Sequence, residues 1–169
     1  RDEKAEPHTP EDVVIPPYLI DTPSVRKDMA QYYDEVQRLD RYVGSVVEEL
    51  KEQGILDSTV ILFMADNGRP FPRCKTRLYD SGIKTPFIVH WPNSSVKPGS
   101  VCNSLVSVID IAPTILNLAG LTPPPSFQGV SMAALLTDPE TSIRQYVFAE
   151  HNWHGQIAHE RMVRRDGRP

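Results

Sequence analysis

The chain has 169 residues, of which 40% are apolar and 24% charged, a composition typical of one folded domain or of part of one. Its 18 Lys and Arg residues are outnumbered by 22 Asp and Glu residues, and the net charge of −4 argues against a nucleic-acid partner. No apolar run approaches about 18 residues, the length needed to span a membrane. The 16 prolines indicate stiff, irregular loops, which often carry functional sites.

The first part of the chain predicts an arm followed by a long helix. Residues 1–21 are charged and rich in proline, and we expect an irregular arm that runs over the surface. Thr22 and Pro23 are typical of a helix N-cap and of the first helical position. Apolar residues then recur every three or four positions from Val25 to Leu50, which predicts a long helix with one apolar face. Gly54 is a good terminator for it.

The rest of the chain alternates strands and helices. A continuous apolar run at 59–65 predicts a strand buried on both faces, as in a parallel or mixed sheet covered by helices. A second strand is predicted at 87–91 and a second helix at 107–119. The remaining predicted elements are a short helix at 131–136, a strand at 146–149 and a strand that begins at 162–163. This order predicts an α/β fold with helices packed on a mixed or parallel sheet.

The first predicted strand ends in two residues that suit a metal ion. In open α/β sheets ligands bind at the carboxyl ends of strands, and Asp66 and Asn67 lie at that end. A carboxylate and an amide oxygen are ligands that Ca²⁺ or Mg²⁺ accepts, although two oxygens do not complete a calcium shell. The alternative is that Asp66, Asn67 and Gly68 only form a β-turn.

These residues belong to a longer series of motifs that resembles the sulfatase family. Residues 65–68 read Ala-Asp-Asn-Gly, similar to the family's Ser/Ala-Asp-Asn-Gly strand end. The loop that starts at Lys75 and leads into a strand ending in Trp-Pro is similar to the family loop that begins with Lys-Gly-Thr. Further similar segments lie, in the family's order, at 26–50, 109–116 and 128–132. The resemblance covers nearly the whole chain and implies an alkaline-phosphatase-like fold that is incomplete here.

The resemblance assigns a chemical role to three residues. Asp66 and Asn67 match the family's second pair of calcium ligands, with Mg²⁺ as the alternative ion. Lys75 matches the family lysine that contacts the sulfate group, where an ammonium can neutralise charge that builds on a sulfuryl oxygen. Taken without the resemblance, Lys75 is an ordinary solvated loop lysine.

Two segments resemble one branch of the family, the heparan N-sulfatases or sulfamidases. They are the Pro-Phe-Pro loop at 70–72 and the arm at 14–23. That branch removes sulfate from glucosamine nitrogen, which implies a sulfated, glycosaminoglycan-type sugar as substrate, N-sulfoglucosamine among the choices. The chain departs from the family pattern at 80–82, which read Asp-Ser-Gly in place of Glu-Gly-Gly, and at 84–85, where Lys-Thr replaces the expected Arg. The sequence leaves N- and O-sulfate specificity open.

Polar residues follow the third predicted strand. Glu150, His154, His159 and Arg161 supply hydrogen-bond donors and acceptors near a tryptophan ring, a set suited to binding an anionic sugar. No thiol or Asp partner completes a zinc set there. The alternative is a polar loop that only packs. We expect His8, in the arm, to be solvated.

Parts of the family's chemistry are missing from the sequence. The nucleophile of these enzymes is formylglycine, made from the Cys or Ser of a Cys/Ser-x-Pro-x-Arg motif, and neither Cys74 nor Cys102 lies in one. We interpret them as two ordinary thiols or one optional disulfide. The family's first calcium-binding Asp pair is also absent. We therefore expect residues 22–169 to be the C-terminal portion of a sulfatase catalytic domain, inactive without the remainder of that domain. The sequence itself leaves the location open, and the resemblance implies a periplasmic, secreted or lysosomal one.

Two other functions fit part of the pattern. A metallo-phosphoesterase of the same superfamily usually uses Asp and His ligands for two zinc ions, and Asn67 beside Asp66 argues against that pair. A non-catalytic glycan-binding relative is the third hypothesis, because it would need the sugar site but no nucleophile.

Overall fold

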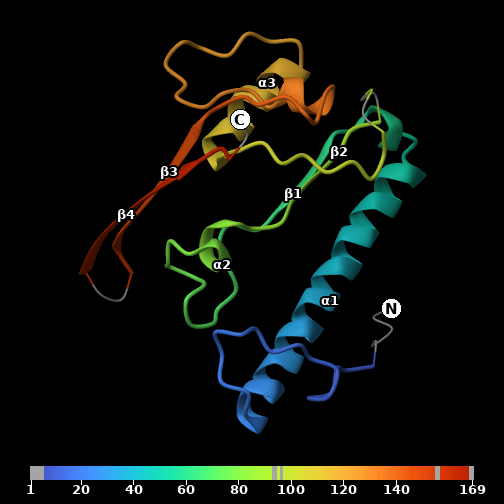
Figure 1. Ribbon diagram of the computed structural model, residues 1–169. Helices are drawn as coiled ribbons and strands as arrows, with labels where there is room; N and C mark the ends of the chain where they lie inside the picture. Colours follow the sequence, from blue (N-terminus) through green and yellow to red (C-terminus); the bar gives the residue numbers. More distant parts are fainter. Residues whose placement is uncertain (1–5, 93–94, 96, 155–156, 168–169) are drawn as a thin grey trace.

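A computed structural model describes residues 6–92, 95, 97–154 and 157–167 (Figure 1). The helices are α1 (Pro23–Glu52), α2 (Asp80–Ile83) and α3 (Ile111–Leu118). Short 3₁₀ helices occur at η1 (Leu56–Ser58), η2 (Val108–Asp110) and η3 (Ala133–Leu136). The strands are β1 (Ile61–Met64), β2 (Phe87–His90), β3 (Tyr146–Trp153) and β4 (Ile157–Arg165). The α/β class predicted from the sequence is confirmed.

The long helix begins and ends where the sequence predicts. The Thr22 side chain accepts a hydrogen bond from the Val25 N–H at 3.3 Å, and Pro23 occupies the first turn, where its missing N–H leaves no bond unmade. Beyond Gln53, Gly54 adopts a left-handed φ of 68°, which only glycine adopts without strain. Helix α1 therefore forms one uninterrupted rod along the side of the molecule (Figure 1).

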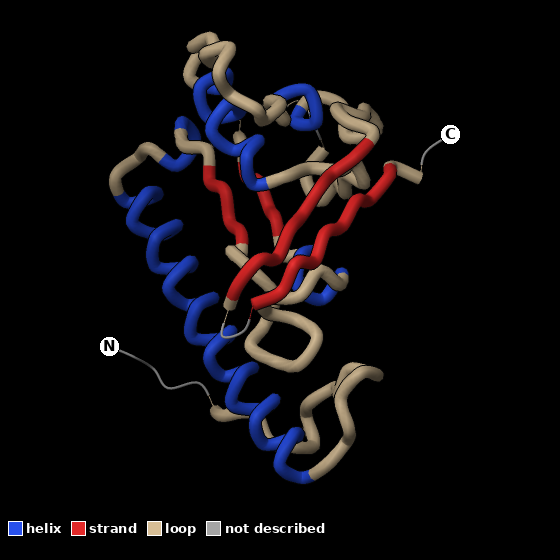
Figure 2. The backbone as a smooth tube through the Cα atoms, turned by 90° about the vertical axis from the view of Figure 1, so that its left-hand side faces the viewer, coloured by secondary structure: helices blue, strands red, loops and turns tan. Residues whose placement is uncertain are grey.

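The two sheets are separate antiparallel pairs. Strand β1 pairs with β2 in a register that joins Ile61 to His90 and Met64 to Phe87, and β3 pairs with β4. The parallel or mixed pairing expected for this chain does not occur among the described residues. Every residue of β1 is only half-buried, because a two-stranded sheet beside one helix cannot cover both faces (Figure 2).

The strands of the β3–β4 hairpin are longer than the sequence predicts. The sequence predicts a strand at 146–149 and the start of another at 162–163. Pairing in the structure extends through Glu150 and Arg161 to Trp153 and Ile157, with an irregularity between His151 and Trp153. Cross-strand hydrogen bonds continue through the polar residues, which carry no apolar signal. In Figure 1 the two strands run from the region of α3 towards the lower left of the molecule.

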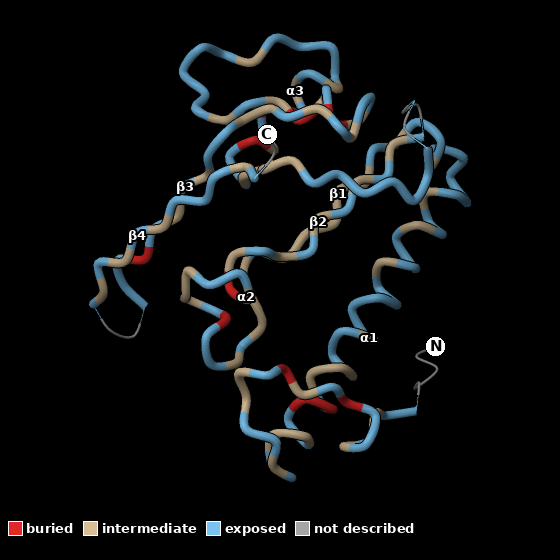
Figure 3. The backbone as a smooth tube through the Cα atoms, in the orientation of Figure 1, coloured by how far each residue is buried: buried red, intermediate tan, exposed pale blue. Residues whose placement is uncertain are grey.

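The proline-rich arm is more buried than expected. Val13 is 5% exposed and forms the main core cluster with Met29 and Ala30 of α1. Half-buried side chains pack around it: Ile15, Leu19, Tyr32, Tyr33 and Phe71. Figure 3 shows buried positions gathered where the arm meets the first turns of α1. The prolines of the arm suggested an irregular surface segment, but its apolar residues anchor it to the helix.

His8 is not a solvated arm residue, which corrects the prediction. Its Nδ1 lies 2.8 Å from the Asp34 Oδ1, and its backbone N–H donates to the same oxygen at 2.8 Å. The ring also meets the Tyr33 ring edge-on, with centroids 5.5 Å apart. The arm is therefore tied to α1 by polar as well as apolar contacts.

A buried carboxylate organises the region around α3. Asp110 is fully buried, pairs with the Arg144 guanidinium, and accepts the N–H groups of Ser107 at 2.7 Å and Val130 at 2.8 Å. It thereby joins the start of α3 to two later loops.

None of the described helices is long and apolar enough to cross a membrane.

Candidate functional site

The Asp66–Asn67 pair lies in a turn that the rest of the loop holds in place. It follows β1 directly, and the next residue, Gly68, donates its N–H to the Gly82 carbonyl at 2.9 Å. A Cβ on Gly68 would lie 2.1 Å from the Ser81 carbonyl oxygen, so only glycine allows this approach. The turn is part of a long loop that packs on itself, rather than a simple hairpin turn.

The side chains of Asp66 and Asn67 are available to a ligand. Asp66 is exposed and Asn67 half-buried, and neither makes a hydrogen bond or ion pair to another residue that the structure describes. Both donor atoms are oxygens, which suits a hard cation such as Ca²⁺. In the described part of the chain, no three His, Cys, Asp or Glu side chains come together as a metal site. The pair therefore fits a calcium ion only as part of a site, since Ca²⁺ takes six to eight oxygens.

Lys75 is exposed and lies beside the segment that follows Asn67. Its backbone N–H donates to the Arg69 carbonyl at 3.1 Å, which closes the short loop between the two. Arg73 and Thr76 on either side adopt left-handed φ values of 66° and 68°, which are uncommon for residues with a side chain. Such conformations persist when neighbouring contacts enforce them, and they cluster at functional sites.

The residue before Lys75 is anchored in the interior. Cys74 is fully buried, and its Sγ lies 3.1 Å from the Tyr18 hydroxyl, which also accepts from the Arg69 Nη2 at 2.8 Å. Burial, followed by the contact with Cys74, raises the pKa of Tyr18 above its ordinary value. Cys74 and Cys102 are both free thiols, so the optional disulfide does not form.

The four residues predicted to bind sugar divide into a pair and two separate histidines. Glu150 and Arg161 face each other across the hairpin, with 3.2 Å between Oε2 and Nε, and both are exposed. His154 and His159 are exposed as well, and the His154 ring lies 6.4 Å from the Trp153 ring. All four remain open to solvent at the end of the β3–β4 hairpin.

Two ion pairs join this hairpin to the Lys75 loop. The Arg77 Nη1 lies 3.0 Å from the Glu160 Oε1, and the Arg164 Nη1 lies 2.6 Å from the Asp80 Oδ1. Arg77 follows Lys75 by two residues, and Asp80 begins α2. Parts of the chain more than 80 residues apart are thus held side by side (Figure 1).

His151 is a buried polar residue of the hairpin and is not among the four predicted sugar-binding residues. It is 7% exposed, its Nδ1 lies 3.5 Å from the Glu160 Oε2, and neither ring nitrogen has a hydrogen-bond partner among the described residues. The signal was available in the strand alternation, because Val147, Ala149 and His151 share the less exposed face of β3.

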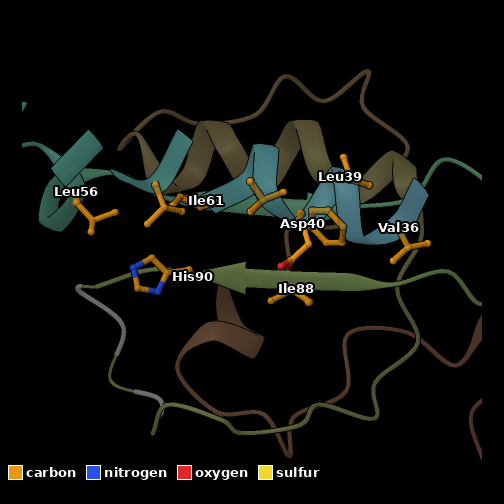
Figure 4. Close-up of a pocket in the computed structure, with 10 residues that line it drawn as sticks. Val36, Leu39, Asp40, Leu56, Ile61, Ile88 and His90 are labelled. Atoms are coloured by element: carbon orange, nitrogen blue, oxygen red, sulfur yellow. The ribbon is translucent and has the colours of Figure 1, made fainter. Parts of the chain in front are cut away.

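A large pocket lies elsewhere and does not fit the predicted chemistry. It has a volume of about 490 Å³ and lies between α1 and the β1–β2 pair (Figure 4). Asp40 and His90 are the polar residues in a lining that is otherwise apolar, including Leu39 and Ile88. An anionic sugar would find few partners there, and none of Asp66, Asn67 and Lys75 contributes to it.

Comparison with known proteins identifies relatives for most of the chain. A family model described as Sulfatase matches residues 2–121. An ulvan-active sulfatase of Formosa agariphila is 38% identical over 135 residues, covering 80% of this chain and 22% of the relative. The N-sulphoglucosamine sulphohydrolase of Homo sapiens is 39% identical over 120 residues, covering 71% of this chain and 24% of the relative. The chain spans about a quarter of the length of these curated relatives.

Two solved structures share the fold. BT4656, in complex with its substrate D-glucosamine-2-N,6-O-disulfate, matches with a TM-score of 0.75 and 23% identity, over 88% of this chain and 33% of that one. A phosphonate monoester hydrolase of Silicibacter pomeroyi matches with a TM-score of 0.67 and 31% identity, over 85% of this chain and 29% of that one. Since the family model and the curated relatives agree, the chain belongs to the sulfatase family.

Proposed function

We propose that this chain is part of an enzyme that hydrolyses sulfate esters or sulfamates on sulfated sugars. The observation that carries the proposal is the hydrogen bond from the Lys75 N–H to the carbonyl of Arg69, two residues beyond Asn67, within a chain of the sulfatase family. Named relatives include an N-sulphoglucosamine sulphohydrolase and an ulvan-active sulfatase, which supports a sulfated sugar as the substrate class. N-sulfoglucosamine is the substrate we propose to test first.

In this proposal Asp66 and Asn67 hold a divalent cation, Ca²⁺ in preference to Mg²⁺. Their oxygens are free of other partners among the described residues, and Ca²⁺ accepts the irregular, oxygen-rich shell that adjacent loop residues offer. When bound, the ion supplies positive charge that polarises the sulfate group. Further oxygen ligands are proposed to come from parts of the protein outside this chain.

Lys75 has the catalytic role in this proposal. Its ammonium carries three donors on a flexible stem, and it binds a sulfuryl oxygen and balances the negative charge that grows there as the bond to the leaving group breaks. The hydrogen bond from the Lys75 N–H to the Arg69 carbonyl fixes the backbone of Lys75, which limits the positions that the ammonium can reach. Lys75 carries the proposed charge stabilisation, whereas no described residue has been assigned as nucleophile.

The β3–β4 hairpin is the proposed sugar-binding element. Glu150 and Arg161 already face each other, and either can exchange that partner for a sugar hydroxyl or a second sulfate. His154 and His159 are exposed and add donors and acceptors nearby. The ion pairs from Arg77 and Asp80 hold this hairpin next to the Lys75 loop, which is why we assign both elements to one substrate.

The nucleophile is proposed to lie outside this chain. No Cys/Ser-x-Pro-x-Arg motif occurs in the sequence, so formylglycine cannot form from its residues by that route. We therefore expect these 169 residues on their own to be inactive. The remainder of the catalytic domain is the partner that would complete the site.

Phosphoryl-type chemistry is the second candidate. It is favoured by the structural match to a phosphonate monoester hydrolase, whose identity of 31% exceeds that of the sulfated-sugar complex. We rank it second because two curated relatives, a sulfatase and a sulphohydrolase, have higher sequence identities of 38% and 39%.

A substrate panel on the intact protein tests the proposal. Inorganic sulfate is measured with N-sulfoglucosamine and glucosamine 6-sulfate, and alcohol release is measured with a phosphonate monoester. We expect sulfate from at least one of the sugars, with a higher kcat/KM than the phosphonate ester supports. Turnover of the phosphonate ester alone would reverse the order of the two candidates, and no turnover of any of the three would leave a glycan-binding role.

A further inference from the structure

We infer that Tyr18 is a positioning residue for Lys75, acting through Cys74 and Arg69. Tyr18 lies in the proline-rich arm, more than 50 residues away in sequence, and its hydroxyl contacts Cys74 and Arg69 rather than Lys75 itself. The role of Lys75 in sulfate hydrolysis is the proposed function on which the catalytic part of this inference rests. The contact itself, called here the Tyr18 tether, comprises Tyr18, Arg69 and Cys74.

Tyr18 contacts both ends of the short loop at 69–74 that leads to Lys75. The Tyr18 hydroxyl lies 3.1 Å from the Cys74 Sγ and accepts from the Arg69 Nη2 at 2.8 Å. The Arg69 guanidinium also lies over the Tyr18 ring, 5.8 Å from its centroid. One side chain of the arm therefore contacts the residue that precedes Lys75 and the residue whose carbonyl accepts the Lys75 N–H.

The loop has little freedom once these contacts form. The Cys74 N–H donates to Phe71 at 3.1 Å, and the Lys75 N–H donates to Arg69 at 3.1 Å. Thr76, just beyond, is held at a left-handed φ of 68°, a conformation that relaxes when its surroundings allow. Loss of the tether would let Cys74 leave the interior and shift the Cα of Lys75 with it.

The arm is rigid enough to act as the fixed end. Leu19, next to Tyr18, packs against the cluster of Val13, Met29 and Ala30. This packing fixes the backbone at Tyr18 relative to α1. Phe71, from the same loop as Lys75, packs against that cluster and meets the Tyr32 ring edge-on with centroids 5.7 Å apart. The loop is thus fastened to α1 both by an apolar contact and by the tether.

Replacement of the hydroxyl alone isolates the tether. Tyr18→Phe keeps the ring over Arg69 but leaves the Cys74 thiol and Arg69 without the oxygen between them. In the intact protein acting on the best sulfated sugar, we expect kcat to fall about 10-fold to 100-fold, the range for a misplaced catalytic group, while KM stays unchanged. The matched control is Tyr42→Phe, which removes a hydroxyl from an exposed ring of α1.

Thiol labelling reports the tether without relying on activity. Iodoacetamide labelling followed by peptide mapping gives the rate at Cys74, with exposed Cys102 as an internal reference in the same sample. We expect Cys74 to react slowly in the unsubstituted protein and in Tyr42→Phe, and faster in Tyr18→Phe. Arg69→Lys, which keeps the charge but loses the planar fork, is a second variant with the same expected result.

The two readouts separate failure of this inference from failure of the proposed function. Faster labelling with a lowered kcat supports the positioning role. Faster labelling with an unchanged kcat overturns it, and so does labelling at Cys74 that neither variant changes. An unsubstituted protein that hydrolyses no sulfated sugar overturns the proposed function and the catalytic part of this inference, whereas the labelling rates still support or overturn the tether.

Discussion

Among single residues, Asp34 links helix α1 to the arm electrostatically. The N–H of His8, followed by its ring, holds the pKa of the Asp34 carboxyl below its ordinary value. A carboxyl group whose pKa is lowered by folding stabilises the folded state only while it is ionised. The contribution is therefore present above the ordinary carboxyl pKa of about 4 and is lost as the pH falls through the lower pKa of the folded state.

We predict that Asp34→Ala destabilises the protein at neutral pH but not in acid. The difference in unfolding free energy between Asp34→Ala and the unsubstituted protein should be present at pH 7 and vanish towards pH 2. Urea unfolding at a series of pH values measures it, with Asp28→Ala, an exposed carboxylate on the same helix, as control. A difference that stays constant down to the lowest pH would show that the carboxylate charge is not its source.

Asp110 is the residue whose loss should cost most stability. Its carboxylate is fully buried, pairs with Arg144, and accepts two backbone N–H groups. Asp110→Ala leaves a largely buried guanidinium and two donors without that partner, and we predict a loss of about 3–5 kcal/mol. Chemical unfolding measures this, with exposed Asp57→Ala as control. A loss no larger than that of the control would mean that Arg144 and the loops find other partners.

At the scale of elements, the turn after β1 depends on a close approach of two backbone segments. Gly68 lies against α2, where a Cβ would meet the Ser81 carbonyl oxygen at 2.1 Å and the Gly82 Cα at 2.8 Å. These atoms belong to the backbone and cannot swing aside, so an added methyl group must move the turn. Asp66 and Asn67, immediately before it, would move as well.

We predict that Gly68→Ala weakens Ca²⁺ binding by about 10-fold to 100-fold, the usual effect of disturbing the support of metal ligands. Calorimetric titration of Ca²⁺ into the chelator-stripped intact protein measures this. Gly44→Ala is the matched control, because a Cβ there meets nothing within 4 Å. In the middle of α1 it should raise stability by about 0.5–1 kcal/mol and leave Ca²⁺ binding unchanged. Equal affinities in both variants would argue against the assignment of the Asp66–Asn67 turn.

Elements with a strong repeating pattern could be predicted from the sequence. Helix α1 has its apolar stripe, its N-cap at Thr22 and its terminator at Gly54, and all three signals agree with the structure. Helix α2 could not be predicted because it has only four residues and includes Gly82. The outer halves of β3 and β4 could not be predicted, because cross-strand hydrogen bonds rather than apolar side chains extend the pairing there.

At the scale of the whole molecule, motifs in the sequence select the residues of the proposed site but not the contacts that support them. Asp66, Asn67 and Lys75 could be selected because motifs in order along the chain point to them. Tyr18 could not, because its contacts with Arg69 and Cys74 span 51 and 56 residues and exist only in the folded chain. Local patterns carry no information on which distant residues meet, so tertiary contacts of this kind need coordinates.

The apolar surface of the molecule also differs from the expectation of a well-covered sheet. Val36 and Leu39 on α1 and Ile88 on β2 are 47%, 48% and 60% exposed, and they line the pocket between helix and sheet (Figure 4). The continuous apolar run of β1 predicts burial on both faces, which the described residues do not provide. This exposure supports the proposal that the chain is part of a larger enzyme.

The role of Lys75 is tested by the kcat/KM for sulfate release by Lys75→Ala in the intact protein. Lys84→Ala, from the same loop, is the matched control, because it also removes an exposed lysine and the same charge. We predict that Lys75→Ala lowers kcat/KM about 10²-fold to 10³-fold, as expected for loss of a group that stabilises developing charge. A Lys75→Ala protein as active as Lys84→Ala would contradict the assignment of this loop as the sulfate-binding part of the site.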